Sequence, residues 1–353
     1  MTATLETKPS VTPPPTLSSI PPSEVDVEAI QRLAQQRQRL LDQISRIIIG
    51  QQEVIDNVLL TIFCGGHALI VGVPGLAKTL LVRCLARALD LSFSRIQFTP
   101  DLMPSDITGT DIIQEDLASG QRKLEFLPGP VFANLILADE INRTPPKTQA
   151  AMLQTMQERE VSIGSKTYPL PAPFHVFATQ NPIEMEGTYV LPEAQADRFM
   201  FNIQCGYPTG AEEERVVRST TGTDLPELTP VLNGNEIIEI QKLVRAMPVS
   251  DEVIRFAVKL VSRTRPEDSC APAYVKEFVR WGASPRASQY LVLGAKALAA
   301  VNGRFCADYE GVRAVARQVL RHRILTNFNA RAQKVTVADL IERLLTEVRH
   351  DGR

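Results

Sequence analysis

The chain has 353 residues, of which 44% are hydrophobic and 22% charged, and its formal net charge is −2. This length is enough for two domains, and the composition is typical of globular proteins. The nearly balanced charge argues against general electrostatic binding to nucleic acid or to an anionic membrane. The sequence shows no apolar run of transmembrane length, no signal-peptide core and no C-x-x-C pair among its five cysteines. We therefore expect a cytoplasmic protein with reduced thiols.

The first 24 residues are rich in proline, serine and threonine, and include Pro13-Pro14-Pro15 and Pro21-Pro22. Such a segment buries too little apolar surface to offset the entropy that is lost on ordering. The sequence therefore predicts a disordered tail over residues 1–24. A proline-rich ligand for a partner is the alternative interpretation.

Two helical patterns follow the tail and are separated at Gly50-Gln51. Apolar residues recur at helical spacing over residues 25–47 and again from Val54 to Leu59. In many nucleotide-binding proteins a short apolar-Gly-Gln stretch before the first strand packs against the adenine. A helix stop at Gly50 explains the same residues equally well, so both interpretations stay open at this point.

Residues 67–79 form the stretch around which the chain is organised. An apolar run of strand length ends at Gly72, a glycine-rich turn follows, and Lys78-Thr79 begins a helical pattern. This is the layout of a phosphate-binding loop, in which backbone N–H groups and a helix N-terminus hold a phosphate. Lys78 would reach the β- and γ-phosphates, and Thr79 would ligate Mg²⁺. The residues expected to surround the nucleotide are Gly72, Pro74, Gly75, Leu76, Ala77, Lys78, Thr79 and Leu80.

Ala77 stands where the pattern G-x-x-x-x-G-K-[ST] has its second glycine. We expect the methyl group to be tolerated if Ala77 keeps ordinary helical angles. A plain strand–turn–helix with a chance lysine is the alternative, and the strand context, the two glycines and the Lys-Thr pair together disfavour it.

An apolar strand over residues 132–138 ends in the acidic pair Asp139-Glu140. In an open parallel sheet the carboxyl ends of the strands meet beside the phosphate loop, so Asp139 would hold the Mg²⁺ shell and Glu140 would polarise the attacking water. Read alone, the pair could equally cap the helix that begins near Pro146. The strand over 174–179 is followed by Asn181, whose amide could reach the γ-phosphate.

Two short hairpins interrupt the alternation of strands and helices. The first pairs residues 111–114 with 123–127, and the second spans 161–170 with a turn at Gly164-Ser165. A short helix over 191–199 then ends in Asp197-Arg198 before the last strand. We interpret the two hairpins as insertions in a nucleotide-binding core.

Helical patterns alone follow Tyr207, so we expect a nucleotide-binding core over 25–206 and a helical domain over 207–353. Arg286 stands in the first turn of an apolar helix, an end that disfavours a cation, so we expect an anion such as a nucleotide phosphate nearby. The predicted helices span about 210–220, 235–247, 251–264, 273–282, 285–301, 308–323 and 336–349.

Five motifs, in this order and spacing, closely resemble the MoxR family of AAA+ ATPases, over roughly residues 25–350. That resemblance implies a fold with an α/β P-loop core, a parallel sheet with flanking helices and hairpin insertions, followed by an all-α lid domain. The motifs are Gly72-Val-Pro-Gly-Leu-Ala-Lys-Thr79, Leu137-Ala-Asp-Glu-Ile-Asn-Arg143, Ala178-Thr-Gln-Asn-Pro182, Leu191-Pro-Glu-Ala-Gln-Ala-Asp-Arg-Phe199 and Gly282-Ala-Ser-Pro-Arg-Ala287.

The resemblance implies a role for each matched residue. Lys78 and Thr79 resemble the Walker A pair, Asp139 and Glu140 the Walker B pair, and Asn181 the first sensor. Arg198 resembles an arginine finger that acts on the nucleotide of a neighbouring subunit, and Arg286 resembles the second sensor, which reports nucleotide state to the lid. Ile49-Gly50-Gln51 fits the adenine-side segment, the hairpins resemble the helix-2 insert and the pre-sensor hairpin, and Ala77 is usual in the family.

These roles imply a Mg²⁺-dependent ATPase that assembles into a ring, expected to be a hexamer, and is inactive as a monomer. MoxR-like proteins are generally regarded as chaperone-like motors that mature client complexes together with a partner carrying a von Willebrand A domain. Two roles stay open for Arg143, namely a contact across the interface and a helix cap.

Three other functions remain as alternatives. A metal-chelatase motor subunit shares most of these motifs. A nucleic-acid motor is disfavoured because the hairpins carry only Arg122, Lys123 and Lys166 as positive charges. A nucleotide-gated scaffold that barely turns ATP over is disfavoured because Glu140 and Arg198 are both present.

Overall fold

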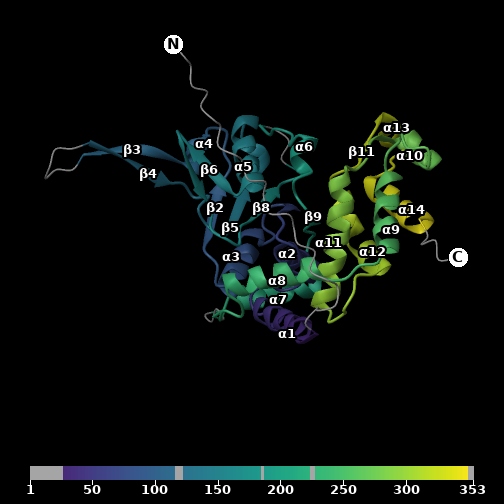
Figure 1. Ribbon diagram of the computed structural model, residues 1–353, viewed down its shortest axis with the longest axis horizontal. Coiled ribbons are helices and arrows are strands. Elements are labelled where there is room, and N and C mark those ends of the chain that lie inside the picture. Colours follow the sequence, from purple (N-terminus) through teal and green to yellow (C-terminus); the bar gives the residue numbers. More distant parts are fainter. Residues whose placement is uncertain (1–26, 116–121, 184–186, 223–226, 349–353) are drawn as a thin grey trace, which may run out of the picture.

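A five-stranded parallel sheet in the order β2-β5-β8-β1-β9 forms the centre of the protein. The computed structural model describes residues 27–115, 122–183, 187–222 and 227–348 (Figure 1), so the predicted tail over 1–24 lies outside the described residues. The strands are β1 (Ala68–Val71), β2 (Phe93–Gln97), β5 (Leu135–Asp139), β8 (His175–Gln180) and β9 (Phe201–Gln204). The expected parallel sheet is confirmed.

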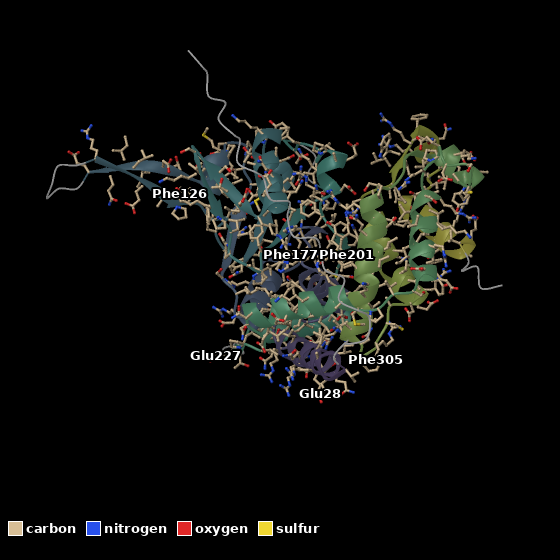
Figure 2. All side chains as sticks on the ribbon, viewed as in Figure 1. Glu28, Phe126, Phe177, Phe201, Glu227 and Phe305 are labelled. Atoms are coloured by element: carbon tan, nitrogen blue, oxygen red, sulfur yellow. The ribbon has the colours of Figure 1, made fainter. Side chains whose placement is uncertain are left out.

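Apolar side chains cover both faces of the sheet, because successive residues of a strand point to opposite faces. Leu135 and Leu137 of β5 pack in one cluster with α1, α2 and α3, whereas Ile136 and Ala138 pack in a second cluster with α5. Ala68 of β1 pairs in register with Phe177 and Phe201, which lie at the centre of the molecule (Figure 2). The helices of this part are α1 (Val27–Ile44), α2 (Gln52–Phe63), α3 (Lys78–Ala88), α4 (Pro104–Thr108), η1 (Ile141–Arg143), α5 (Pro146–Glu158) and α6 (Glu193–Ala196).

Both predicted hairpins are confirmed. Strands β3 (Gly109–Glu115) and β4 (Arg122–Pro128) pair antiparallel and project far from the body of the molecule (Figure 1). Strands β6 (Glu160–Ile163) and β7 (Lys166–Pro169) form the second hairpin. The Phe126 ring of β4 stacks on the Tyr168 ring of β7 with centroids 4.0 Å apart, so the two hairpins are joined near the base of the first.

The predicted run of helices after residue 207 is confirmed, and two details of it differ: the sequence did not predict the short helix α13 (Phe328–Ala332), and the helix over 273–282 is shorter than expected. The expected helix over 273–282 ends at Phe278, because β10 (Val279–Trp281) pairs with β11 (Leu325–Thr326) in a short antiparallel ribbon. The helices are α7 (Gly210–Thr220), α8 (Gly234–Ala246), α9 (Asp251–Ser262), α10 (Ala273–Phe278), α11 (Pro285–Val301), α12 (Tyr309–Leu320), α13 (Phe328–Ala332) and α14 (Val337–Glu347). Among the described residues, each helix is too short or too polar to span a lipid bilayer.

Helices α7 and α8 lie with α1 and α3 beside the sheet, whereas α9 to α14 form a helical group to one side, in which α11 packs against α1, α2 and α8 (Figure 1). The segment before α8 is tied to the end of α3, since the Val231 N–H donates to the Ala88 carbonyl at 2.8 Å. Gln241 of α8 donates through Nε2 to the Ile62 carbonyl of α2 at 2.9 Å. Strands give way to helices at 206–210, but the first helices after this point pack on the core. The boundary between two domains there stays a prediction.

Two buried histidines bind strands β1 and β8 to their surroundings. Nδ1 of His67 accepts the Val176 N–H at 2.9 Å, and its Nε2 lies 3.2 Å from the Met156 carbonyl oxygen. Nδ1 of His175 lies 2.9 Å from the Gly66 carbonyl oxygen. A ring that donates through one nitrogen and accepts through the other is neutral. Burial lowers the pKa of His67 to about 3 and the pKa of His175 to about 4.

The free energy of unfolding is therefore expected to decrease as the pH falls below about 6.5, the histidine pKa in an unfolded chain. His67 and His175 stay neutral in the folded state, so only the unfolded chain binds protons until the pH reaches the folded pKa values. Between pH 7 and pH 5 the two residues together should remove roughly 4 kcal/mol. Urea unfolding at both pH values measures this loss. His322, whose pKa burial also lowers, adds to the loss in both proteins, so the variant His67→Gln should lose about 2 kcal/mol less than the wild type. Equal stability of the wild type at both pH values would contradict the prediction.

Candidate active site

The phosphate-binding loop connects β1 to α3, as predicted. Gly75 has φ of 84°, a left-handed angle that glycine adopts without strain. Ala77, directly before the helix, has φ of 55° and ψ of 21°. The expectation that Ala77 keeps ordinary helical angles is therefore wrong: the loop needs a left-handed residue at this position, and the alanine methyl group adds about 1–2 kcal/mol of local strain.

The ammonium group of Lys78 lies inside this loop. Its Nζ donates to the Gly72 carbonyl and, at 3.1 Å, to the Val73 carbonyl. Partial burial lowers the pKa of Lys78, while the nearby Cys205 thiol and the carboxylates of the acidic pair oppose that shift. The lysine is thus placed where phosphate oxygens would replace backbone carbonyls as its acceptors.

Asp139 ends strand β5 beside the first turn of α3. Thr179 Oγ1 donates to Asp139 Oδ1 at 2.6 Å, and Thr79 Oγ1 lies 3.5 Å from Asp139 Oδ2. Arg95 of β2 donates to the same Oδ2 through Nε at 3.0 Å and Nη2 at 2.7 Å. Hydroxyl and carboxylate oxygens are the donors that Mg²⁺ prefers, so Thr79 and Asp139 fit the expected magnesium site.

Glu140 follows in a left-handed conformation with φ of 59°. Its N–H donates to Thr179 Oγ1 at 2.8 Å, and its Oε2 accepts Gln97 Nε2 at 2.8 Å and Arg143 Nη1 at 3.0 Å. Such backbone strain persists only where the surroundings enforce it, and it is common at active sites. Arg143, whose role the sequence left open, pairs with Glu140 within one chain.

Asn181 follows β8, the strand between β5 and β1, and its side chain is buried. Its Oδ1 accepts the Ile183 N–H at 3.1 Å. Its Nδ2 is buried and has no hydrogen-bond partner among the described residues. A buried amide without an acceptor retains a donor for a ligand or water oxygen. Lys78, Thr79, Asp139, Glu140 and Asn181 together are called the phosphate site below.

The adenine-side segment contacts the phosphate loop directly. Gln51 has φ of 55°, and its Nε2 donates to the Leu76 carbonyl at 3.1 Å. A Cβ on Gly50 would lie 2.7 Å from the carboxylate of Glu212, at the first turn of α7. The segment therefore forms part of the site wall. The helix stop expected at Gly50 is not observed, because α1 ends at Ile44 and Gln51 stands directly before α2.

Arg198 and Arg286 do not reach the phosphate site. They line a cavity of about 230 Å³ at the amino end of β1, beside Gly66. The anion expected near Arg286 is the Asp197 carboxylate, whose Oδ2 lies 3.5 Å from Nη1. The cavity, called the arginine pocket below, is defined by Arg159, Arg198, Arg245 and Arg286.

Comparison with known proteins agrees with this architecture. Residues 67–201 match the model of the ATPase family associated with various cellular activities (AAA), and residues 272–344 match the AAA lid domain. The chain is 43% identical over 311 residues to the chaperone MoxR1 of Mycobacterium tuberculosis, covering 88% of this chain and 81% of that protein. The chain belongs to the MoxR family of AAA+ ATPases.

Other relatives extend the likeness over nearly the whole chain. The protein is 36% identical over 312 residues to YeaC, an uncharacterised protein of Bacillus subtilis, covering 88% of this chain and 93% of YeaC. It is 31% identical over 298 residues to the MoxR protein of Methylorubrum extorquens, covering 80% and 85%. The crystal structure of a candidate ATPase from Cytophaga hutchinsonii has a TM-score of 0.84 at 40% identity, covering 91% of this chain and 97% of that one.

Three residues of this MoxR-family site were missed from the sequence, namely Arg95, Gln97 and Thr179. Gln97 pairs in register with Asp139, which places β2 beside the acidic pair. The polar alternation of Arg95 and Gln97 in an apolar strand was a usable signal, because residues i and i+2 share one face. All three hold the carboxylates of the acidic pair in fixed orientations.

Replacing Gly72 with alanine is expected to lower the free energy of unfolding by about 1–3 kcal/mol and to weaken nucleotide binding, because overpacking displaces the loop. A Cβ at Gly72 would lie 2.5 Å from the Cys205 carbonyl oxygen. Gly206→Ala is the matched control, since a Cβ there meets no described atom within 4 Å. Urea unfolding and titration with a fluorescent nucleotide measure both effects. Equal behaviour of the two variants would contradict the clash.

Proposed function

We propose that this MoxR-family protein hydrolyses ATP with Mg²⁺ at the interfaces between copies of the chain in a ring, taken as a hexamer. The observation that carries the proposal is the position of two half-sites at opposite ends of β1. The phosphate site adjoins Gly72, and the arginine pocket adjoins Gly66. Gly72 lies six positions after Gly66 along an extended chain, a distance of about 20 Å. A single side chain does not span it, so Arg198 would serve the nucleotide of another copy.

Binding of ATP would use residues of one copy. In this proposal Lys78 binds the β- and γ-phosphates, the loop N–H groups surround them, and Gln51 lies on the adenine side. Thr79 and Asp139 would hold Mg²⁺, which neutralises charge on the phosphates.

Hydrolysis would use residues of two copies. Glu140 polarises the attacking water, and Asn181 Nδ2 donates to the water or to a γ-phosphate oxygen. Arg198 and Arg286 of the neighbouring copy stabilise the charge that develops on the transferred phosphoryl group.

We assign this hydrolysis to chaperone-like remodelling of a protein client, together with a partner that carries a von Willebrand A domain, in the cytoplasm. A relative of 43% identity is named a chaperone, which supports the first part. On the projecting hairpin, Ile113 and Leu124 are 69% and 61% exposed and pair across the two strands. A protruding apolar pair of this kind offers a contact surface for a protein.

The test is ATP turnover per subunit as a function of protein concentration, with Glu140→Gln as the blank. Turnover that rises cooperatively with concentration and disappears in the variant is the expected result, because each site would need two copies. Turnover per subunit that is constant with concentration, or unchanged by Glu140→Gln, would overturn the proposal. Sedimentation at the same concentrations reports whether rings form.

A further inference from the structure

The arginine pocket contains more positive charge than the assigned residues account for. Arg198 and Arg286 come from the segment after α6 and from the first turn of α11. Arg159 comes from the C-terminal end of α5, and Arg245 from the last turn of α8. Four separate elements therefore contribute arginines to the lining of one cavity of about 230 Å³.

These arginines are poorly neutralised. Arg286 lies 3.5 Å from Asp197, whereas Arg159, Arg198 and Arg245 form no ion pair among the described residues. The described lining of the cavity includes no aspartate or glutamate beside them. Like charges gathered without counter-charges repel one another, so the pocket is suited to a multiply charged anion.

The neighbouring buried groups respond to this positive field. Burial is the main cause of the low pKa of His67, and the charge of Arg159 lowers it further. Burial also lowers the pKa of Lys296, and Arg245 adds to that effect. Arg159 and Arg245 thus add positive charge beside His67, which lines the cavity, and beside Lys296.

The side chain of Arg159 is held in one orientation that suits binding of an anion. It ends α5 in a left-handed conformation with φ of 56°, and its Nη2 donates to the Gly65 carbonyl at 3.1 Å. A guanidinium group has five N–H donors in a rigid plane, so one bond to the backbone fixes its direction and leaves donors for a ligand. The strained backbone places this residue beside the start of β1.

We infer that Arg159 is a further anion-binding residue of the ATPase, which contacts the phosphates of a nucleotide held by a second copy of this chain, with Arg245 beside it. The inference rests on the proposed function, because the nucleotide reaches the pocket only at an interface. Planar guanidinium groups bind phosphate oxygens through paired hydrogen bonds, and several of them match the several charges of a triphosphate. An acidic side chain of the second copy is the other possible occupant, and the experiment separates the two.

The experiment mixes two deficient variants of the full chain. Arg159→Gln is expected to lower ATP turnover about 10–100-fold, the effect of one charge-assisted hydrogen bond, while its own phosphate loop still binds nucleotide. Lys78→Ala lacks the phosphate loop lysine but keeps Arg159. Mixing them at equal amounts should restore turnover, because about a quarter of randomly formed interfaces then join an intact loop to an intact Arg159. Arg159→Lys should retain part of the activity, and Arg218→Gln, at an exposed arginine paired with Glu214, is the matched control.

The outcomes distinguish this inference from the proposed function. Arg198→Ala is mixed with Lys78→Ala in parallel. If the Arg198 mixture regains turnover and the Arg159 mixture does not, Arg159 does not act on a neighbour and the inference is wrong. If neither mixture regains turnover, the proposal that ATP is hydrolysed at an interface between copies is wrong. If Arg159→Gln prevents ring assembly in the presence of nucleotide while turnover of the rings that do form is normal, Arg159 binds an acidic side chain and the inference is again wrong.

Discussion

Replacing Arg198 with alanine is expected to lower ATP turnover about 10³–10⁵-fold, the range for an arginine supplied to a phosphoryl-transfer site by a neighbour. Nucleotide binding should persist, because the phosphate site lies about 20 Å away along β1. The fold should persist as well, since the Arg198 side chain forms no ion pair or hydrogen bond among the described residues whose loss would leave a buried charge alone.

Steady-state turnover and nucleotide titration on the same preparation separate these effects. Arg218→Ala is the control, because Arg218 is exposed on α7 and its one ion pair among the described residues is with Glu214. Unchanged turnover of Arg198→Ala with nucleotide still bound would remove Arg198 from the site.

Replacing Arg323 with alanine is expected to lower the free energy of unfolding by about 3–5 kcal/mol, because a buried ion pair and the hydrogen bonds of its guanidinium group would be broken. The Arg323 side chain is 1% exposed. Its Nε donates to Asp197 Oδ1 at 2.7 Å, and its Nη2 donates to the carbonyls of Asp197 and Phe199 at 2.8 and 2.6 Å. The truncation would remove these bonds and leave the Asp197 carboxylate with Ser284 and the more distant Arg286 as its partners.

Chemical denaturation measures this loss, and Arg317→Ala supplies the comparison from the same region. Arg317 is on α12, is 57% exposed and pairs with Glu342, so its removal should change stability by less than about 1 kcal/mol. An Arg323→Ala protein as stable as Arg317→Ala would show that the Asp197 ion pair contributes little.

Local chemistry made the phosphate site predictable. The loop is one continuous stretch with a distinctive residue pattern, and the acidic pair and Asn181 each directly follow a buried strand. In a parallel sheet the strand ends share one edge, so position in the sequence was enough to predict their meeting. The observed contacts of Thr79 and Thr179 with Asp139 agree with that expectation.

The remaining features depend on tertiary contacts that a local pattern does not contain. Gln97 reaches Glu140 because of the register between β2 and β5, and α8 joins the core through bonds such as Gln241 to Ile62. The end of α10 at Phe278 is decided by pairing with residues 325–326, nearly fifty positions later. Ala77 shows the converse case, in which the loop geometry imposes a backbone angle that the residue itself disfavours.

Asp197 connects the helical group of α9 to α14 with Arg198, the next residue in the chain. Ser284 Oγ donates to its carboxylate oxygens at 3.0 and 2.9 Å, Arg323 binds it from beyond α12, and the Tyr290 hydroxyl donates to the Arg198 carbonyl at 3.3 Å. Asp197 and the backbone of Arg198 are therefore bonded to α11 and to the segment after α12. In the proposed ring, a mechanical load on the helical group of one copy would advance or withdraw the arginine that the next copy needs. The load on each subunit would then decide the order in which the sites of the ring hydrolyse ATP. A client held by one subunit would control when its neighbour hydrolyses ATP.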